Sequence, residues 1–133
     1  MLGDAFSADA AIRLASADPA DGVPDGWRAL DIGPATVAAF ADVLAPCRTV
    51  VWNGPMGAFE LAPFAAGTSG VAEVIAALRR ALTIVGGGDS IAALAAAGLT
   101  DSVDWVSTGG GAMLALLAGE PLPAVEALAI REG

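Results

Sequence analysis

Three glycine-rich turns hold the residues whose types and spacing are best suited to binding chemistry. They are Asn53-Gly54-Pro55, Gly86-Gly87-Gly88 and Gly109-Gly110-Gly111, and each follows a short apolar run that favours a strand. The second and third turns lead into helical patterns. Glycine lets a backbone approach a ligand closely, and the first amide groups of a helix are unpaired donors at the positive end of its dipole. Two such ends side by side would suit an anion with several phosphates, whereas one glycine turn would be an ordinary connection.

Two carboxylates stand near these turns. Asp89 follows the second turn directly, and a carboxylate there would repel a phosphate unless a cation lay between them. Mg²⁺ is the natural cation, because it takes one or two carboxylates together with phosphate oxygens. Asp89 and Ser90 are equally suited to capping the following helix. Spacing alone leaves the two interpretations of Asp89, metal ligand and helix cap, equally open. Glu60 could accept hydrogen bonds from ribose hydroxyls, but its position alone favours a solvated loop carboxylate.

The charged residues exclude several function classes. The 133 residues include 15 acidic and 6 basic ones, for a net charge of -9, and every basic residue is Arg. Because the sequence has no Lys and no His, it cannot form a Walker-type phosphate loop, a Ser-His-Asp or Cys-His site, or a His-based zinc site. The acidic balance argues against nucleic acid as a partner.

The cellular setting follows from two further patterns. Cys47 is the only cysteine, so an intrachain disulfide is impossible, and a reducing, cytoplasmic setting fits best. The start of the sequence lacks the basic and apolar regions of a signal peptide. No apolar stretch reaches the ~18 residues of a membrane helix, so we expect no membrane association.

The order of the predicted elements places the turns on one edge of a sheet. Residues 1–30 are predicted to be irregular. Strands are predicted over 48–52, 82–85 and 103–106, and helices over 34–44, 68–81, 91–97, 112–118 and 121–130, with Gly98 and Gly119 as helix stops. Alternating strands and helices imply a parallel sheet in an α/β fold, where ligands lie beyond the carboxyl ends of the strands. Trp52 and Trp105 are both predicted to lie in the core.

Several motifs, in order and spacing, resemble the phosphoglycerate kinase family along the whole chain. The most specific is Val50 to Glu60 (VVWNGPMGAFE), and Asp4 to Ala10 resembles a family segment that follows an earlier strand. The other matching segments are Asp31 to Pro34, Phe64 to Thr68, Val85 to Ser90, Ala97 to Leu99, Ser107 to Ala112 and Leu122 to Leu128.

The resemblance implies a fold and an activity. The fold is a three-layer open parallel sheet with helices on both faces, an incomplete Rossmann-like lobe. Residues 1–133 would be the later part of the carboxy-terminal, nucleotide-binding domain, with 121–133 a tail that packs towards the other lobe. The family, typically monomeric and cytoplasmic, uses Mg²⁺ to transfer a phosphoryl group between 1,3-bisphosphoglycerate and ADP, giving 3-phosphoglycerate and ATP in glycolysis.

The resemblance also implies roles for particular residues. Glu60 matches the residue that holds the ribose, and Asp89 matches the Mg²⁺ ligand. The backbone amides of Gly87, Gly110 and Gly111 match those that face the transferring phosphoryl group. The nucleotide would be bound by Ala29, Asn53, Pro55, Glu60, Gly86, Gly87, Gly88, Asp89 and Ser90. Ala29 is a departure, because many members have Gly there.

A larger departure is that the family's nucleotide-phosphate Lys, its glycerate-binding Arg and His residues and its first lobe are not in this sequence. Phosphoryl transfer depends on positioning and on positive charge around the transferring group. We therefore expect a fragment that is inactive alone. Two alternatives stay open: a free-standing nucleotide- or anion-binding module, and a remnant that folds poorly because a sheet edge is exposed.

Overall fold

A computed structural model describes residues 1–15 and 18–128 of the chain. The first part is a small antiparallel sheet in which β1 (Leu2–Gly3) pairs with β2 (Ile12–Arg13) and β3 (Arg28–Ala29), with a short 3-10 turn η1 (Pro19–Asp21) between the last two. The prediction that residues 1–30 are irregular is therefore wrong. Each strand is two residues long, so it leaves no alternating apolar pattern in the sequence.

The main sheet has three parallel strands in the order β4-β5-β6, as the alternation of elements predicts. They are β4 (Thr49–Asn53), β5 (Leu82–Gly86) and β6 (Trp105–Ser107). Asn53 pairs with Gly86, and Gly86 pairs with Ser107, so the carboxyl ends of all three strands are level. This register brings the three glycine-rich turns to one edge of the sheet.

The helices agree with the predicted elements except at their ends. They are α1 (Pro34–Leu44), α2 (Ala66–Ala77), α3 (Gly88–Ala96), α4 (Gly110–Leu117) and α5 (Pro123–Leu128), with 3-10 turns η2 (Ala62–Phe64) and η3 (Thr100–Ser102). Helices α3 and α4 start inside their glycine turns, earlier than predicted. Gly98 and Gly119 have φ of +67° and +74°, so both glycines stop their helices in the left-handed region. The part of the 121–130 helix beyond Leu128 lies outside the described residues.

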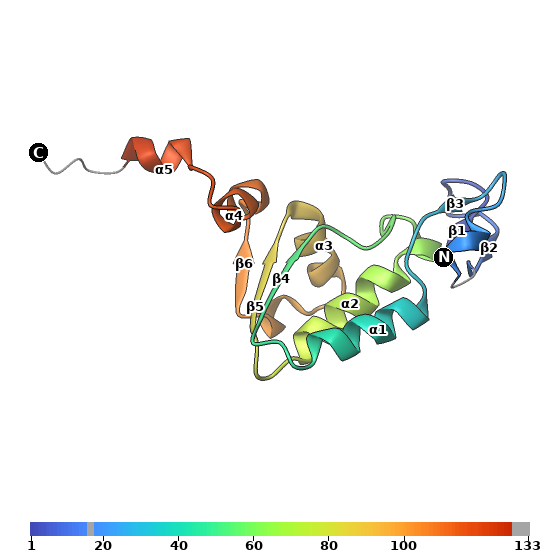
Figure 1. Ribbon diagram of the computed structural model, residues 1–133, viewed down its shortest axis with the longest axis horizontal. Helices are drawn as coiled ribbons and strands as arrows, with labels where there is room; N and C mark the ends of the chain where they lie inside the picture. The colour runs from blue at the N-terminus through green and yellow to red at the C-terminus, as the bar shows by residue number, and fades with distance from the viewer. Residues whose placement is uncertain (16–17, 129–133) are drawn as a thin grey trace, which may run out of the picture.

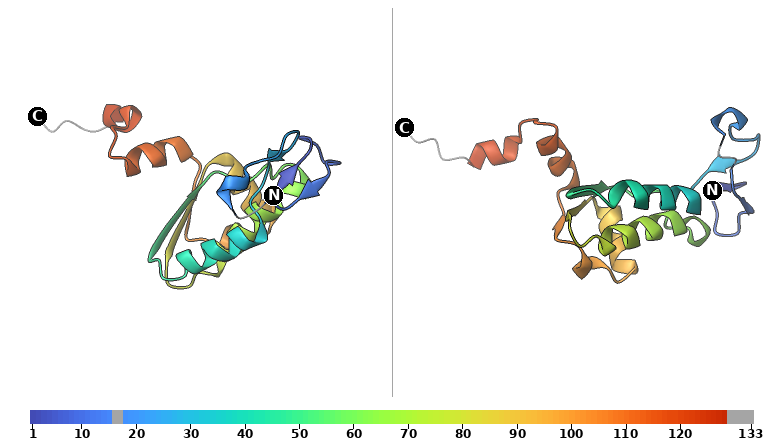
Figure 2. Two further views of the ribbon diagram at one scale, coloured as in Figure 1. Left: turned by 45° about the vertical axis from the view of Figure 1, so that its right-hand side comes forward. Right: turned by 60° about the horizontal axis from the view of Figure 1, so that its bottom comes forward.

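One face of the sheet carries the core. Val50, Trp52 and Val85 point towards α2 and α3, whose contributions include Ile75 and Leu94. Helix α1 lies alongside α2 on this side, as the views in Figure 1 and Figure 2 agree. The prediction that Trp52 is a core residue is confirmed, because its side chain is 4% exposed.

Of the helices in the described part of the chain, α4 lies over the opposite face and covers it only in part. Val51, Ile84 and Trp105 line an apolar cavity of about 400 Å³ together with α4 residues that include Met113 and Leu116. Trp105 is 66% exposed, so its prediction as a core residue is wrong. It lies on the edge strand β6, and its side chain faces the sparsely covered side. Helices nevertheless occur on both faces, which fits an incomplete Rossmann-like lobe.

The two ends of the described chain lie away from the main sheet β4–β6 (Figure 1). In Figure 1 the small sheet β1–β3 is at one end of the molecule and α5 projects from the other. Within the described ranges, no helix has the length and apolar character needed to cross a lipid bilayer.

Candidate functional site

The second and third glycine turns touch each other through their backbones. A Cβ atom on Gly110 would lie 2.6 Å from the Gly87 backbone nitrogen and 2.8 Å from its Cα. A Cβ on Gly86 would lie 2.4 Å from Cε of Met113. Because α3 begins at Gly88 and α4 at Gly110, the amino ends of the two helices are neighbours. Glycine is needed at position 110 because a side chain there would push against the Gly87 backbone, whereas the flexible end of Met113 could move away from a side chain at position 86.

Asn53 joins the first turn to the other two. Its Nδ2 donates a hydrogen bond of 3.2 Å to the Gly110 carbonyl oxygen. Its Oδ1 lies against Gly87, since a Cβ there would be 3.0 Å from that oxygen. Gly87 has φ of +89°, which glycine adopts without strain. Asn53, at the end of β4, therefore fixes the relative positions of the starts of α3 and α4.

Ser90, which is buried, holds the first glycine turn in place through a hydrogen bond. Its fully buried hydroxyl oxygen accepts a 2.7 Å hydrogen bond from the Gly54 amide. The prediction that Asp89 and Ser90 cap α3 is wrong: the N-cap is Gly87, and no side chain bonds the first-turn amides. Helix α3 starts at Gly88, so both residues lie within its first turn. The Ser90 hydroxyl is occupied in positioning the loop after β4.

The open side of this cluster presents helix amides. Helix geometry leaves the amides of Gly88, Asp89 and Ser90 in α3, and of Gly110 and Gly111 in α4, without intrahelical acceptors. Nothing lies within 4 Å of a Cβ built on Gly88 or Gly111, so these two glycines face open space. Two helix dipoles point their positive ends at this region, which favours an anion.

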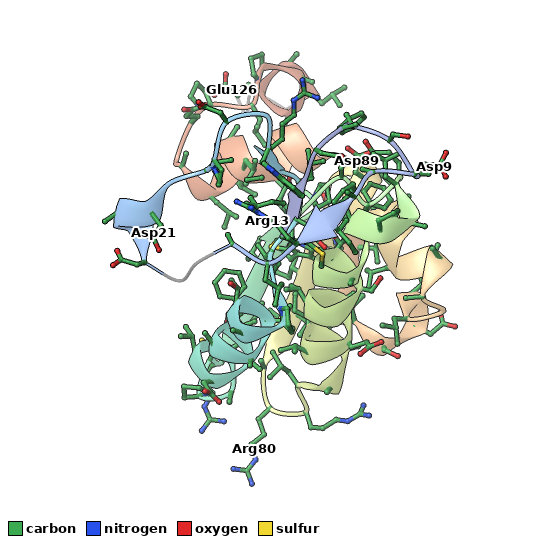
Figure 3. The ribbon with its side chains drawn as sticks, turned by 90° about the vertical axis from the view of Figure 1, so that its right-hand side faces the viewer. Asp9, Arg13, Asp21, Arg80, Asp89 and Glu126 are labelled. Carbon is green, nitrogen blue, oxygen red and sulfur yellow. The ribbon has the colours of Figure 1, made fainter. Side chains whose placement is uncertain are left out.

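Asp89 is the charged side chain at the rim of the cluster. It is exposed in the first turn of α3, and Figure 3 shows it in the upper part of the view, with Arg80 at the bottom. Among residues 1–15 and 18–128, no three His, Cys, Asp or Glu side chains are grouped to hold a metal ion. A cation at Asp89 would therefore depend on oxygens of a bound ligand and water. That donor set fits Mg²⁺, which keeps few protein ligands.

Two further predicted site residues line one cavity beside the cluster. Ala29 and Pro55 are both on the wall of a cavity of about 460 Å³, formed by segments 29–32 and 55–58. The Ala58 amide donates a 2.8 Å hydrogen bond to the Leu30 carbonyl oxygen and so ties the two segments together. Pro55 continues the Asn53-Gly54 turn, which makes this cavity adjacent to the glycine cluster along the chain.

The structure does not bring Glu60 into either group. Its side chain is exposed and does not line the Ala29–Pro55 cavity. Within the described part of the chain, no hydrogen bond engages its carboxylate. Its role as a ribose ligand stays a prediction.

Sequence reasoning assigned no role to two buried polar residues that shape this region. The Thr68 hydroxyl oxygen accepts a 3.0 Å hydrogen bond from the Met56 amide. The Asp31 carboxylate accepts hydrogen bonds from the amides of Gly67 and Ile32. Both residues belong to motifs that carried the family resemblance. A carboxylate directly before Ile-Gly-Pro, at the start of a helical pattern, was the available signal for Asp31.

The fold is therefore an open parallel α/β sheet with two adjoining helix amino ends beyond its strands, an arrangement suited to an anion. The family model described as phosphoglycerate kinase matches residues 1–120. The chain therefore belongs to the phosphoglycerate kinase family.

Individual relatives agree with this membership. Phosphoglycerate kinase from Roseiflexus castenholzii is 52% identical over 128 residues, which cover 96% of this chain and 31% of that protein. Cytosolic phosphoglycerate kinase from Triticum aestivum is 50% identical over 130 residues, with 96% and 32% covered. The structure of phosphoglycerate kinase from Coxiella burnetii superposes with a TM-score of 0.83 at 42% identity, over 94% of this chain and 31% of that one. The chain thus spans about a third of the length of these relatives.

Proposed function

We propose that this chain is the MgADP- or MgATP-binding part of a phosphoglycerate kinase. The whole protein would transfer a phosphoryl group between 1,3-bisphosphoglycerate and ADP. The observation that carries the proposal is the backbone contact between Gly87 and Gly110, which places the amino ends of α3 and α4 together. A nucleotide's phosphates are the multiply charged anion that two adjoining helix ends suit.

In this proposal the phosphates lie over the exposed starts of the two helices. The amides of Gly87, Gly110 and Gly111 would face the transferring phosphoryl group and stabilise the charge that it carries. Asn53 would keep these amides in place by its bond to Gly110. The nucleoside part would lie in the cavity between Ala29 and Pro55, and Glu60 would reach the ribose from the following loop.

Asp89 would hold Mg²⁺ together with phosphate oxygens, and the ion would neutralise charge on the transferring group. The backbone amides of Gly86 to Ser90 would complete the phosphate-binding loop. These roles, with the Asp89 side chain on the ion and backbone amides on the phosphates, are consistent with the exposure of Asp89. They are also consistent with the Ser90 hydroxyl, which is buried and already accepts a hydrogen bond from Gly54.

The glycerate substrate would be bound by other parts of the whole protein. This chain spans about a third of its relatives, contains no Lys or His and has a net charge of -9. We propose that it does not catalyse transfer alone, that the whole protein is cytoplasmic and monomeric, and that neither nucleic acid nor a membrane is its partner.

Titration calorimetry of the chain with ADP, with and without Mg²⁺, tests this proposal. We expect weak binding that requires Mg²⁺. Asp89→Ala should remove the Mg²⁺ dependence and leave the circular dichroism spectrum unchanged, because the Asp89 side chain caps no helix amide. Asp101→Ala is the matched control, since it removes an exposed carboxylate from η3, beyond the other end of α3.

Two results would count against the proposal. If the unmodified chain binds ADP with the same affinity with and without Mg²⁺, Asp89 is not a metal ligand. Equal affinity for Mg-pyrophosphate and MgADP would show that the nucleoside is not recognised, and would favour a simple anion-binding module.

A further inference from the structure

Asp31 is a buried carboxylate at a point where three segments of the chain meet. It is 8% exposed and lies just before α1. Its Oδ2 accepts a 2.7 Å hydrogen bond from the Gly67 amide in the first turn of α2, and its Oδ1 accepts a 2.9 Å bond from the Ile32 amide. A carboxylate at the positive end of a helix forms charge-assisted bonds of this kind. Asp31 thereby fastens segment 29–32 to α2.

The same carboxylate also touches the loop that follows the first glycine turn. A Cβ on Gly57 would lie 2.3 Å from Oδ1 of Asp31, and a Cβ on Gly67 would lie 2.2 Å from it. The backbone at each glycine therefore packs directly against the carboxylate, and a Cβ atom at either position would overlap it. This packing explains why glycine is required at positions 57 and 67.

Helix α2 holds the loop from its other side. The Thr68 hydroxyl, next to Gly67, accepts the hydrogen bond of the Met56 amide. The Ala58 amide bonds the Leu30 carbonyl oxygen directly. Segments 29–32 and 55–58 are the two walls of the cavity that contains Ala29 and Pro55. One wall is thus tied to α2 by Asp31 and the other by Thr68.

We infer that Asp31 is a positioning residue that sets the separation of the two walls of this cavity and so controls affinity for the nucleoside part of the ligand. The inference rests on the proposed function, in which this cavity takes the nucleoside and the glycine cluster takes the phosphates. The Asp31 carboxylate is engaged by the amides of Ile32 and Gly67, so it acts on the cavity through segment 29–32 and α2. Its effect is confined to one of the two subsites.

The test uses Asp31→Asn in the full chain, with Asp104→Asn as the matched control. Asn keeps the shape of the side chain, but its amide group cannot accept from both Ile32 and Gly67. Asp104 also accepts a backbone amide, that of Thr83 at 2.8 Å, but at the amino ends of the strands, away from the site. Calorimetry is run with three probes: MgADP, adenosine and Mg-pyrophosphate. Amide hydrogen exchange is followed by NMR in each variant.

We expect Asp31→Asn to bind adenosine and MgADP about tenfold more weakly, with Mg-pyrophosphate unchanged. Exchange should become faster at the Gly67 and Ala58 amides and stay the same at Val85 in the core. Asp104→Asn should bind all three probes as the unmodified chain does. Thr68→Val, which frees the other wall, should give the same split between adenosine and Mg-pyrophosphate, and provides the test if Asp31→Asn does not fold.

Two results would overturn the inference. An equal loss of Mg-pyrophosphate affinity would mean that Asp31 acts through general stability, and unchanged exchange at Ala58 would mean that it does not hold the walls. If the unmodified chain binds neither adenosine nor MgADP, the proposed function fails. The exchange comparison then still decides whether Asp31 sets the walls.

Discussion

At the scale of single residues, the neighbouring glycines Gly110 and Gly111 have different structural roles. Gly110 lies against the Gly87 backbone with no room for another atom, whereas Gly111 faces open space. Both would expose an amide to a bound phosphate, but Gly110 is also the contact that joins α3 to α4. Position 110 therefore requires glycine for packing, whereas position 111 needs only a free backbone amide.

Gly110→Ala should destabilise the chain by about 1–3 kcal/mol, because the added methyl group overlaps backbone atoms that cannot move aside. Gly111→Ala should leave the free energy of unfolding unchanged or raise it by up to about 1 kcal/mol, since alanine favours the helix. Urea unfolding followed by circular dichroism measures both. Equal effects of the two substitutions would mean that the helix starts do not pack as closely as described.

At the scale of elements, one carboxylate ties β5 to the segment before β6. Asp104 Oδ2 accepts hydrogen bonds from the Thr83 amide and hydroxyl, and the Asp104 amide donates to the Thr83 hydroxyl oxygen. The hydrogen bond from the Thr83 backbone amide lowers the pKa of the Asp104 carboxyl below its ordinary value of 3.8, and the bond from the Thr83 hydroxyl lowers it further. This tie secures the amino end of the edge strand, opposite the candidate site.

The lowered pKa makes this contribution depend on pH. A carboxyl whose pKa is lower in the folded state stabilises that state above its ordinary value of 3.8 and stops doing so as the pH falls through the lowered pKa. We therefore expect the unmodified chain to exceed Asp104→Asn in stability at about pH 7, with the difference shrinking towards about pH 2. Urea unfolding of both chains across this range measures the difference. A constant difference would assign the effect to packing.

At the scale of the whole molecule, the second face of the main sheet is only partly covered. Trp105, Leu116 and Leu117 are each at least 60% exposed around one apolar cavity. The chain also spans about a third of the length of its relatives. Both observations are consistent with the proposal that the chain functions as part of a larger enzyme.

The chain alone should not transfer phosphoryl groups between 3-phosphoglycerate and MgATP at a useful rate. Holding two substrates in line can contribute roughly 7–11 kcal/mol to catalysis. Losing half of that would slow the reaction by a few orders of magnitude, at about 1.4 kcal/mol per factor of ten. A coupled assay on purified chain, with and without the separately produced remainder of a phosphoglycerate kinase, measures this. Turnover by the chain alone that Asp89→Ala abolishes would show that it is catalytically complete.

The sequence by itself determined the elements that have a local signature. The run from Pro34 to Leu44 has helical spacing and a proline at its first position, and it forms α1 with those bounds. Gly98 and Gly119 stop their helices as predicted, because a left-handed residue is a local requirement. The parallel sheet followed from the alternation of strands and helices. The family followed from motifs such as WNGPMGAFE, which are read without any structure.

Only the tertiary structure decided what depends on partners distant in the chain. The strands β1 to β3 are too short to show a pattern and exist through pairing with each other. Ser90 was expected to cap its own helix, but its hydroxyl bonds Gly54, 36 residues away. Trp105 is as apolar as Trp52, yet only one of them is covered. Burial, long-range hydrogen bonds and the contact of Gly87 with Gly110 are properties of the assembled fold, because each joins segments that sequence spacing leaves independent.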